Sequence, residues 1–146
     1  MDPNTLKKLE IYFGENPSFV GKPATDADIA HAESTLGLKF NDDYEQFIRS
    51  FGGCIIGIDV HAFENSPILG RETVVDLTEG FRRSCPEAAG ESYSNYFAIS
   101  DDGSGNRILM TADDDRIFIF YHDSGCAEVL FDSLEDMITA CGALDA

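Results

Sequence analysis

The sequence predicts an α+β fold in which helices pack against a single antiparallel sheet. Helical periodicity of apolar residues marks much of the first half of the chain. Short apolar segments separated by turn-forming residues fill residues 96–131 and indicate a strand meander. An amphipathic segment follows, and this order suits one layer of sheet with helices against it. The length of 146 residues predicts one domain spanning residues 1–146.

The N-terminal part of the chain contains the first helix signals. A short helix is predicted at residues 5–13, and residues 14–23 form a loop because they hold two Gly and two Pro. Thr25 then begins a second helix as an N-cap, Asp28 completes a capping box, and Gly37 ends the helix.

A third helix starts after Asn41 or Asp42 and stops at Gly52. Its apolar residues follow the i, i+3, i+4, i+7 pattern: Tyr44, Phe47, Ile48 and Phe51. About five residues join this helix to the preceding one, so the two are expected to form an antiparallel helical pair.

The middle of the chain changes period twice. Residues 54–60 are short, apolar and rich in β-branched side chains, which predicts one strand. Residues 73–83 return to helical spacing, and residues 87–95 are small and polar, which predicts a loop.

Residues 96–131 are predicted to form a four-stranded meander. The predicted strands are Tyr96–Ile99, Arg107–Thr111, Arg116–His122 and Ala127–Phe131. Five consecutive apolar residues at 117–121 predict a central strand buried on both faces. Ser133 then caps a final helix, whose expected buried stripe is Leu134, Met137, Ile138 and Cys141.

The charge of the chain favours a basic partner. The formal net charge is −17, and residues 87–146 hold 13 acidic side chains against only Arg107 and Arg116. Such a charge disfavours nucleic acid and anionic membranes, which are polyanions. A solvated acidic surface without a specific partner is the alternative explanation.

The first residues lack a basic segment followed by an apolar one, and no apolar run nears the roughly 20 residues that span a bilayer. The cytoplasm is therefore the expected location.

The sequence predicts neither a catalytic centre nor a cofactor or metal site. The turn at residues 101–106 has adjacent acids and lacks the alternating ligands and final Glu of a calcium loop. The Asp113–Asp115 turn suits a solvated or partner-facing tip better than an octahedral cage. The four cysteines have no zinc-like spacing and are expected to be buried. A Cys–His nucleophilic pair formed in space stays open, because such pairs need not be adjacent in sequence.

Four blocks of residues, in order, carry a family resemblance. The first comprises Ile29, Glu33, residues 36–40, Asp43-Tyr44, Phe47-Ile48 and Gly52-Gly53. The second is residues 97–106, the third is the aromatic strand ending at residues 121–123, and the fourth is the closing helix. Together, across roughly residues 25–141, they resemble the SUKH superfamily. The chain departs from that pattern with Asn41 in place of a Pro, Phe51 in place of an Asn, and no Trp.

The resemblance implies a binding role. Many bacterial SUKH members are immunity proteins encoded beside polymorphic toxins, often nucleases or deaminases, and fungal relatives scaffold cell-wall signalling. It therefore favours an immunity-type protein that neutralises a basic toxin by direct contact, with an intracellular scaffold or regulatory module as the alternative. The candidate contact residues are acidic side chains in the predicted turns: Asp101, Asp102, Asp113, Asp114, Asp115 and Asp123.

Overall fold

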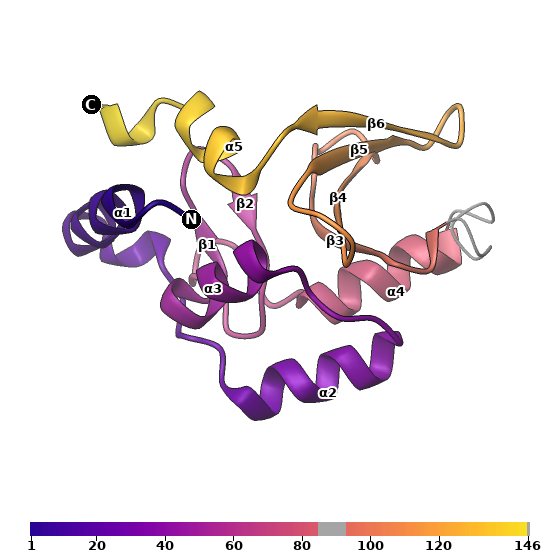
Figure 1. The fold of residues 1–146 in the computed structure, drawn as a ribbon, viewed down its shortest axis with the longest axis horizontal. Coiled ribbons are helices and arrows are strands. Elements are labelled where there is room, and N and C mark those ends of the chain that lie inside the picture. Colours follow the sequence, from indigo (N-terminus) through magenta and orange to yellow (C-terminus); the bar gives the residue numbers. More distant parts are fainter. Residues whose placement is uncertain (85–92, 146) are drawn as a thin grey trace.

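A computed structural model describes residues 1–84 and 93–145, and it has the predicted α+β architecture (Figure 1). The helices are α1 (Pro3–Glu15), η1 (Pro17–Phe19), α2 (Asp26–Leu36), α3 (Asp42–Phe51), α4 (Val74–Ser84), α5 (Leu134–Ala140) and η4 (Ala143–Asp145). The strands are β1 (Cys54–Ile55), β2 (Asp59–Val60), β3 (Tyr96–Asp101), β4 (Arg107–Thr111), β5 (Ile117–Tyr121) and β6 (Cys126–Phe131). Within the described residues, no helix is both long and apolar enough to cross a bilayer.

The strands form two antiparallel sheets, so the prediction of a single sheet is wrong in this detail. The meander has the order β3-β4-β5-β6, whereas residues 54–60 form a separate hairpin of β1 and β2. Gly57 reverses the chain with a φ of +76°, a conformation that side chains disfavour. A Cβ at Gly57 would also lie 2.8 Å from the Cβ of Cys141. The reversal therefore splits the predicted strand in two.

Side-chain caps start α2, α3 and α5 where the sequence predicted, whereas α1 begins at Pro3, two residues before its predicted start. Thr25 and Asp28 form a reciprocal capping box, and Gly37 ends α2 with a φ of +69°. Thr73 and Asp76 make the same two hydrogen bonds before α4, at 3.0 and 3.1 Å. These bonds satisfy amides that have no partner within the first helical turn.

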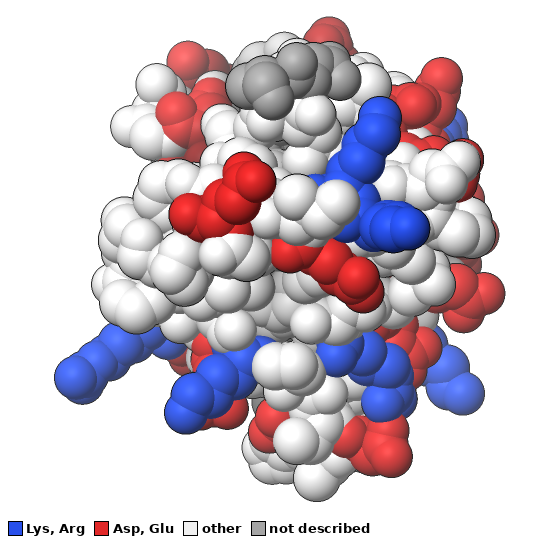
Figure 2. Space-filling model, turned by 90° about the vertical axis from the view of Figure 1, so that its left-hand side faces the viewer, with Lys and Arg blue, Asp and Glu red and all other residues white. Residues whose placement is uncertain are grey.

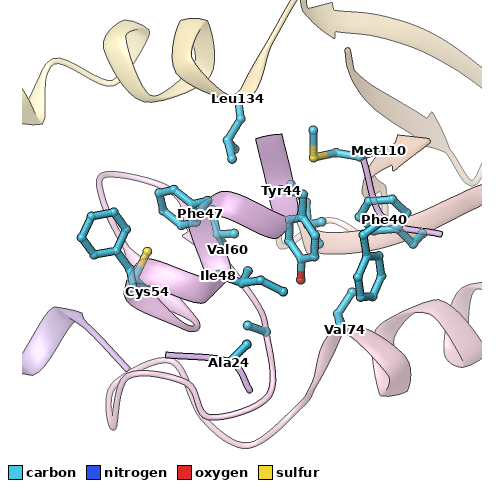
Figure 3. Packing of buried hydrophobic residues seen from close by; sticks show 14 of the residues in the cluster. Ala24, Phe40, Tyr44, Phe47, Ile48, Cys54, Val60, Val74, Met110 and Leu134 are labelled. Atoms are coloured by element: carbon cyan, nitrogen blue, oxygen red, sulfur yellow. The ribbon is translucent and has the colours of Figure 1, made fainter. Parts of the chain in front are cut away.

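Helix α3 lies at the centre of the main core (Figures 1 and 3). Tyr44, Phe47 and Ile48 are fully buried. The Tyr44 hydroxyl donates to the backbone oxygen of His61 at 2.6 Å, which satisfies two polar groups inside an apolar cluster. The predicted close pairing of α2 with α3 is not the dominant contact, since α2 packs more extensively on α4.

The meander separates two apolar clusters. On one face, Leu109 and Phe120 pack with Leu77 and Phe81 of α4. On the other face, residues such as Ile99, Met110 and Ile117 join the main core around α3 and α5. The alternation of side chains along each strand produces this division.

Strand β5 is buried on both faces only in its first part. Ile117, Phe118 and Phe120 are buried, but Ile119 and Tyr121 are half-exposed. Ile119 packs against the main core, whereas Tyr121 does not belong to it, so one face of the sheet opens to solvent near Tyr121. Strand β6 is more exposed still, and none of its residues is buried.

Two other predictions need correction or lie outside the described residues. Cys54 is buried and Cys141 is half-buried, but Cys126 is exposed because it lies on the outer strand β6. Cys85 lies outside the described residues, and so does the first part of the predicted loop at 87–95, through residue 92.

Candidate functional site

The six candidate contact residues divide between the two ends of the meander. Successive turns of an antiparallel meander emerge at opposite ends of the sheet. The β3–β4 and β5–β6 turns therefore share one end, which places Asp101 and Asp102 on the same side as Asp123. The β4–β5 turn, with residues 113–115, lies at the other end. The structure thus brings the candidates together in two groups of three.

The two turns at the first end are tied by one side chain. The Asn106 Oδ1 accepts from the backbone N–H of His122 at 3.1 Å and lies 2.8 Å from His122 Nδ1. The Nε2 of the same ring lies 3.1 Å from the Asp123 carboxylate. Asn106 and His122 thereby link the β3–β4 turn to the β5–β6 turn.

Asp101 and Asp102 shape the β3–β4 turn and still present negative charge. Asp102 accepts from the backbone N–H of Ser104 at 2.8 Å and from both nitrogens of Asn106 at 2.8 and 3.1 Å. These hydrogen bonds lower the pKa of Asp102, and the bond from Ser104 has the largest effect. The Asp102 carboxylate therefore stays ionised at neutral pH. Asp101 accepts from the N–H of Gly103 at 2.8 Å. Both side chains are exposed, so their charge is available to a partner.

At the other end, the three Asp residues are not equivalent. Asp114 pairs with Arg116 at 2.9 Å, and the hydrogen bond from Arg116 lowers the pKa of Asp114. Partial burial, and then the charges of Asp43 and Asp42, raise the pKa of Asp115. The acidic surface at this end therefore includes the start of α3, which the sequence did not assign to it.

A groove of about 460 Å³ opens beside the first end of the sheet. Three acids border it: Asp59 from β2, Asp101 at the end of β3 and Asp102 from the β3–β4 turn. Apolar side chains from the β1–β2 turn, the sheet and α5 also line it: Ile58, Ile108, Leu130, Phe131 and Met137. No Lys or Arg belongs to its described lining. Apolar surface with a few fixed charges is the usual composition of a binding site.

The open face of the sheet continues the groove. The strand register places Ser100, Ile108, Ile119 and Glu128 in one row across β3, β4, β5 and β6. Tyr121 follows Ile119 on the same face, because side chains alternate along the strand. The charge of Glu128, followed by partial desolvation and a hydrogen bond to Glu128, raises the pKa of Tyr121.

Sequence reasoning missed Asp59, Tyr121 and Glu128 as members of this surface. Asp59 joins it through the hairpin reversal at Gly57. Tyr121 and Glu128 meet only through the β5–β6 register. A signal was present in the alternation of 117–121, which places Tyr121 on the face of Ile119.

Charges of both signs lie on the side of the molecule that carries α1. Figure 2 shows the side on which α1 lies, and there Lys and Arg are interspersed with Asp and Glu. That mixed surface contrasts with the groove, whose described charged lining is entirely acidic.

Two described side chains that could carry chemistry, Cys54 and His61, are held by their surroundings. Burial raises the pKa of the Cys54 thiol far above neutrality, so this side chain is not a thiolate. His61 Nδ1 lies 2.7 Å from the backbone oxygen of Glu72. Among residues 1–84 and 93–145, no group of three or more His, Cys, Asp or Glu is placed to hold a metal ion.

Comparison with known proteins extends this picture. The model of the SMI1 / KNR4 family (SUKH-1) matches residues 23–140, which covers every helix and strand from α2 to α5. The chain is also similar to the SPbeta prophage-derived uncharacterized protein YokK of Bacillus subtilis (strain 168). The two are 27% identical over 139 residues, which cover 81% of this chain and 70% of YokK. On the family match, the chain belongs to the SMI1 / KNR4 family (SUKH-1).

Proposed function

We propose that this protein is an immunity-type binding protein that neutralises a basic, nuclease-like toxin by direct contact and has no catalytic activity of its own. The observation that carries the proposal is the acidic end of the meander, where Asp59, Asp101 and Asp102 border an apolar groove whose described lining has no basic residue. A nuclease cleft is basic because it binds phosphates, so an acidic surface complements it.

The two ends of the sheet are assigned different contributions. The groove end combines charge with apolar area, and we assign the contact itself to this end, with Asp101, Asp102 and Asp123. The other end carries Asp113, Asp114 and Asp115, none of which lines this groove, and we assign to it electrostatic steering of association. Long-range charge changes the association rate more than the dissociation rate.

Growth rescue tests the proposal. The toxin domain encoded beside this chain is expressed in a bacterial host from an inducible promoter, with and without this protein. We expect growth to be restored and the purified proteins to form a complex whose association slows with added salt. If the host is not rescued and the pair does not bind at micromolar concentrations, the immunity role is wrong, and a scaffold or regulatory partner becomes the better hypothesis.

A further inference from the structure

Strand β6 is an open sheet edge. It pairs with β5 on one side only, and the described part of the chain makes no backbone hydrogen bond to its other side. Val129 and Leu130 expose 46% and 41% of their surface on this strand. A register shift opposite Ile117 and Phe118 makes Leu130 the extra residue between Val129 and Phe131. The unpaired backbone N–H and C=O groups of an outer strand are a template for a strand from another chain, and exposed apolar side chains favour that pairing.

The groove lies next to this edge. Leu130 and Phe131 of β6 form part of its lining, together with Asp59 and Asp101. Glu128 lies two residues before Leu130 and is exposed. It is the β6 member of the row of side chains that crosses the sheet through Ile119. A strand added to β6 would therefore lie beside Glu128 and beside the part of the groove lining that Leu130 and Phe131 form.

Resting on the proposed function, we propose that an extended basic segment of the toxin pairs with β6 as a fifth strand and places a Lys or Arg side chain in the groove. Backbone hydrogen bonds along β6 supply affinity in such strand addition, and side-chain pockets supply specificity. The alkyl stem of the basic side chain would cover Leu130, and its charged head would lie at the mouth of the groove, where Glu128 is near and the charges of Asp59 and Asp101 attract it from a distance.

Charge selects this occupant over a second copy of the chain. A second β6 would bring another Glu128 and another negatively charged protein against the same edge. Like charges across paired strands are destabilising, and natural sheets place charges on edge strands to prevent self-pairing. A basic strand meets the opposite situation, because Glu128 and the groove acids attract it.

Two matched substitutions test the surface in the full-length protein. Leu130→Lys places a cation on the edge, and Ile11→Lys places one on α1, where Ile11 is 56% exposed. Figure 1 shows α1 on the side of the molecule away from β6. Against the neighbouring toxin domain, we expect Leu130→Lys to raise Kd at least tenfold and Ile11→Lys to change it less than twofold. Thermal melts of both variants confirm that each is folded.

Removal of two acidic charges and measurement of hydrogen exchange test the fifth strand further. Asp59→Asn combined with Glu128→Gln should raise Kd several-fold and reduce its salt dependence, whereas Glu10→Gln on α1 should not. The amides of residues 126–131 should exchange more slowly in the complex. If the toxin binds Leu130→Lys as tightly as the parent protein, or leaves these amides unprotected, the fifth-strand inference is wrong although the proposed function stands.

If the toxin does not bind the parent protein, the proposed function is wrong and the edge can still be judged separately. The probe is then a blocked octapeptide of alternating Arg and Val, with the Glu and Val octapeptide as control. Shifts of backbone amide NMR signals confined to β6 and the groove, seen with the basic peptide only, would support the surface. Absence of such shifts at millimolar peptide would overturn it.

Discussion

Replacing Phe120 with Ala tests the packing of α4 on the meander. The ring is 1% exposed, and its centroid lies 4.9 Å from that of Phe81 and 5.3 Å from that of Tyr93, both in edge-to-face geometry. Phe120 thus fills the centre of the smaller apolar cluster between α4 and the sheet. Its removal would leave a cavity in a layer joined by few other buried side chains.

The expected loss is large for a single substitution. Replacing a buried Phe with Ala lowers the free energy of unfolding by about 3–5 kcal/mol, which includes the lost transfer free energy of the ring and the cost of the cavity. The entropy of unfolding is about 2.1 cal/mol/K per residue, so a chain of this length should lose roughly 10–16 °C in Tm. Val129→Ala, on the exposed edge of the same sheet, should change stability by no more than about 0.5 kcal/mol.

Urea unfolding followed by circular dichroism measures both variants against the parent protein. A loss below about 1 kcal/mol for Phe120→Ala would mean that the cluster collapses around the missing ring or that α4 does not cover this face. An equal loss for Val129→Ala would refute the assignment of β6 as an exposed edge.

Four further outcomes are expected. Tyr44→Phe should cost about 1–3 kcal/mol in urea unfolding, because it leaves the buried backbone oxygen of His61 without its donor. Asp115→Asn should stabilise the protein at pH 7, because burial and nearby acids raise the pKa of Asp115 in the folded state. The stability linked to this carboxyl group is present below its unfolded pKa and is lost as pH rises through its folded pKa. The gain should shrink in urea unfolding at about pH 3.5, where the unfolded-chain carboxyl is also largely protonated. Replacing Asp113, Asp114 and Asp115 together with Asn should slow stopped-flow association with the toxin several-fold at low salt, and an unchanged rate at two ionic strengths would remove this turn from steering. EDTA should leave the Tm unchanged, and a fall of several degrees that calcium reverses would contradict the absence of a structural ion.

Local signals predicted most of the fold. The boundaries of α2 and α3 followed from side-chain caps that act within one helical turn, at Thr25 and Asn41. The four strands of the meander followed from apolar runs separated by residues that turn easily, such as those at 101–106. Each of these signals is contained in a few neighbouring residues, so no distant contact was needed to interpret it.

The errors arose where a distant contact decides the structure. The apolar run at 54–60 is compatible with one strand and with a tight hairpin. The close approach of Cys141 to Gly57 occurs in the hairpin, and the run itself does not contain that information. The burial of Ile119 and Tyr121 depends on how far the main core extends over the sheet, which the apolar run cannot report. Cys126 was expected inside because cysteine usually is, but position on an outer strand overrides that preference.

The candidate site shows the same division between local and distant information. The acids at 101–102 and 113–115 are visible as turns, but negative charge alone describes a solvated surface as well as a binding one. The two ends become distinguishable only in the fold, where the β1–β2 turn and α5 help to enclose a groove that Asp101 lines and Asp113 does not. Apolar area must leave water for affinity to arise, whereas exposed charges mainly govern how fast partners meet. A partner that binds this protein tightly should therefore be sensitive to the apolar edge at Leu130, and a partner that it only attracts should be sensitive to charge at either end.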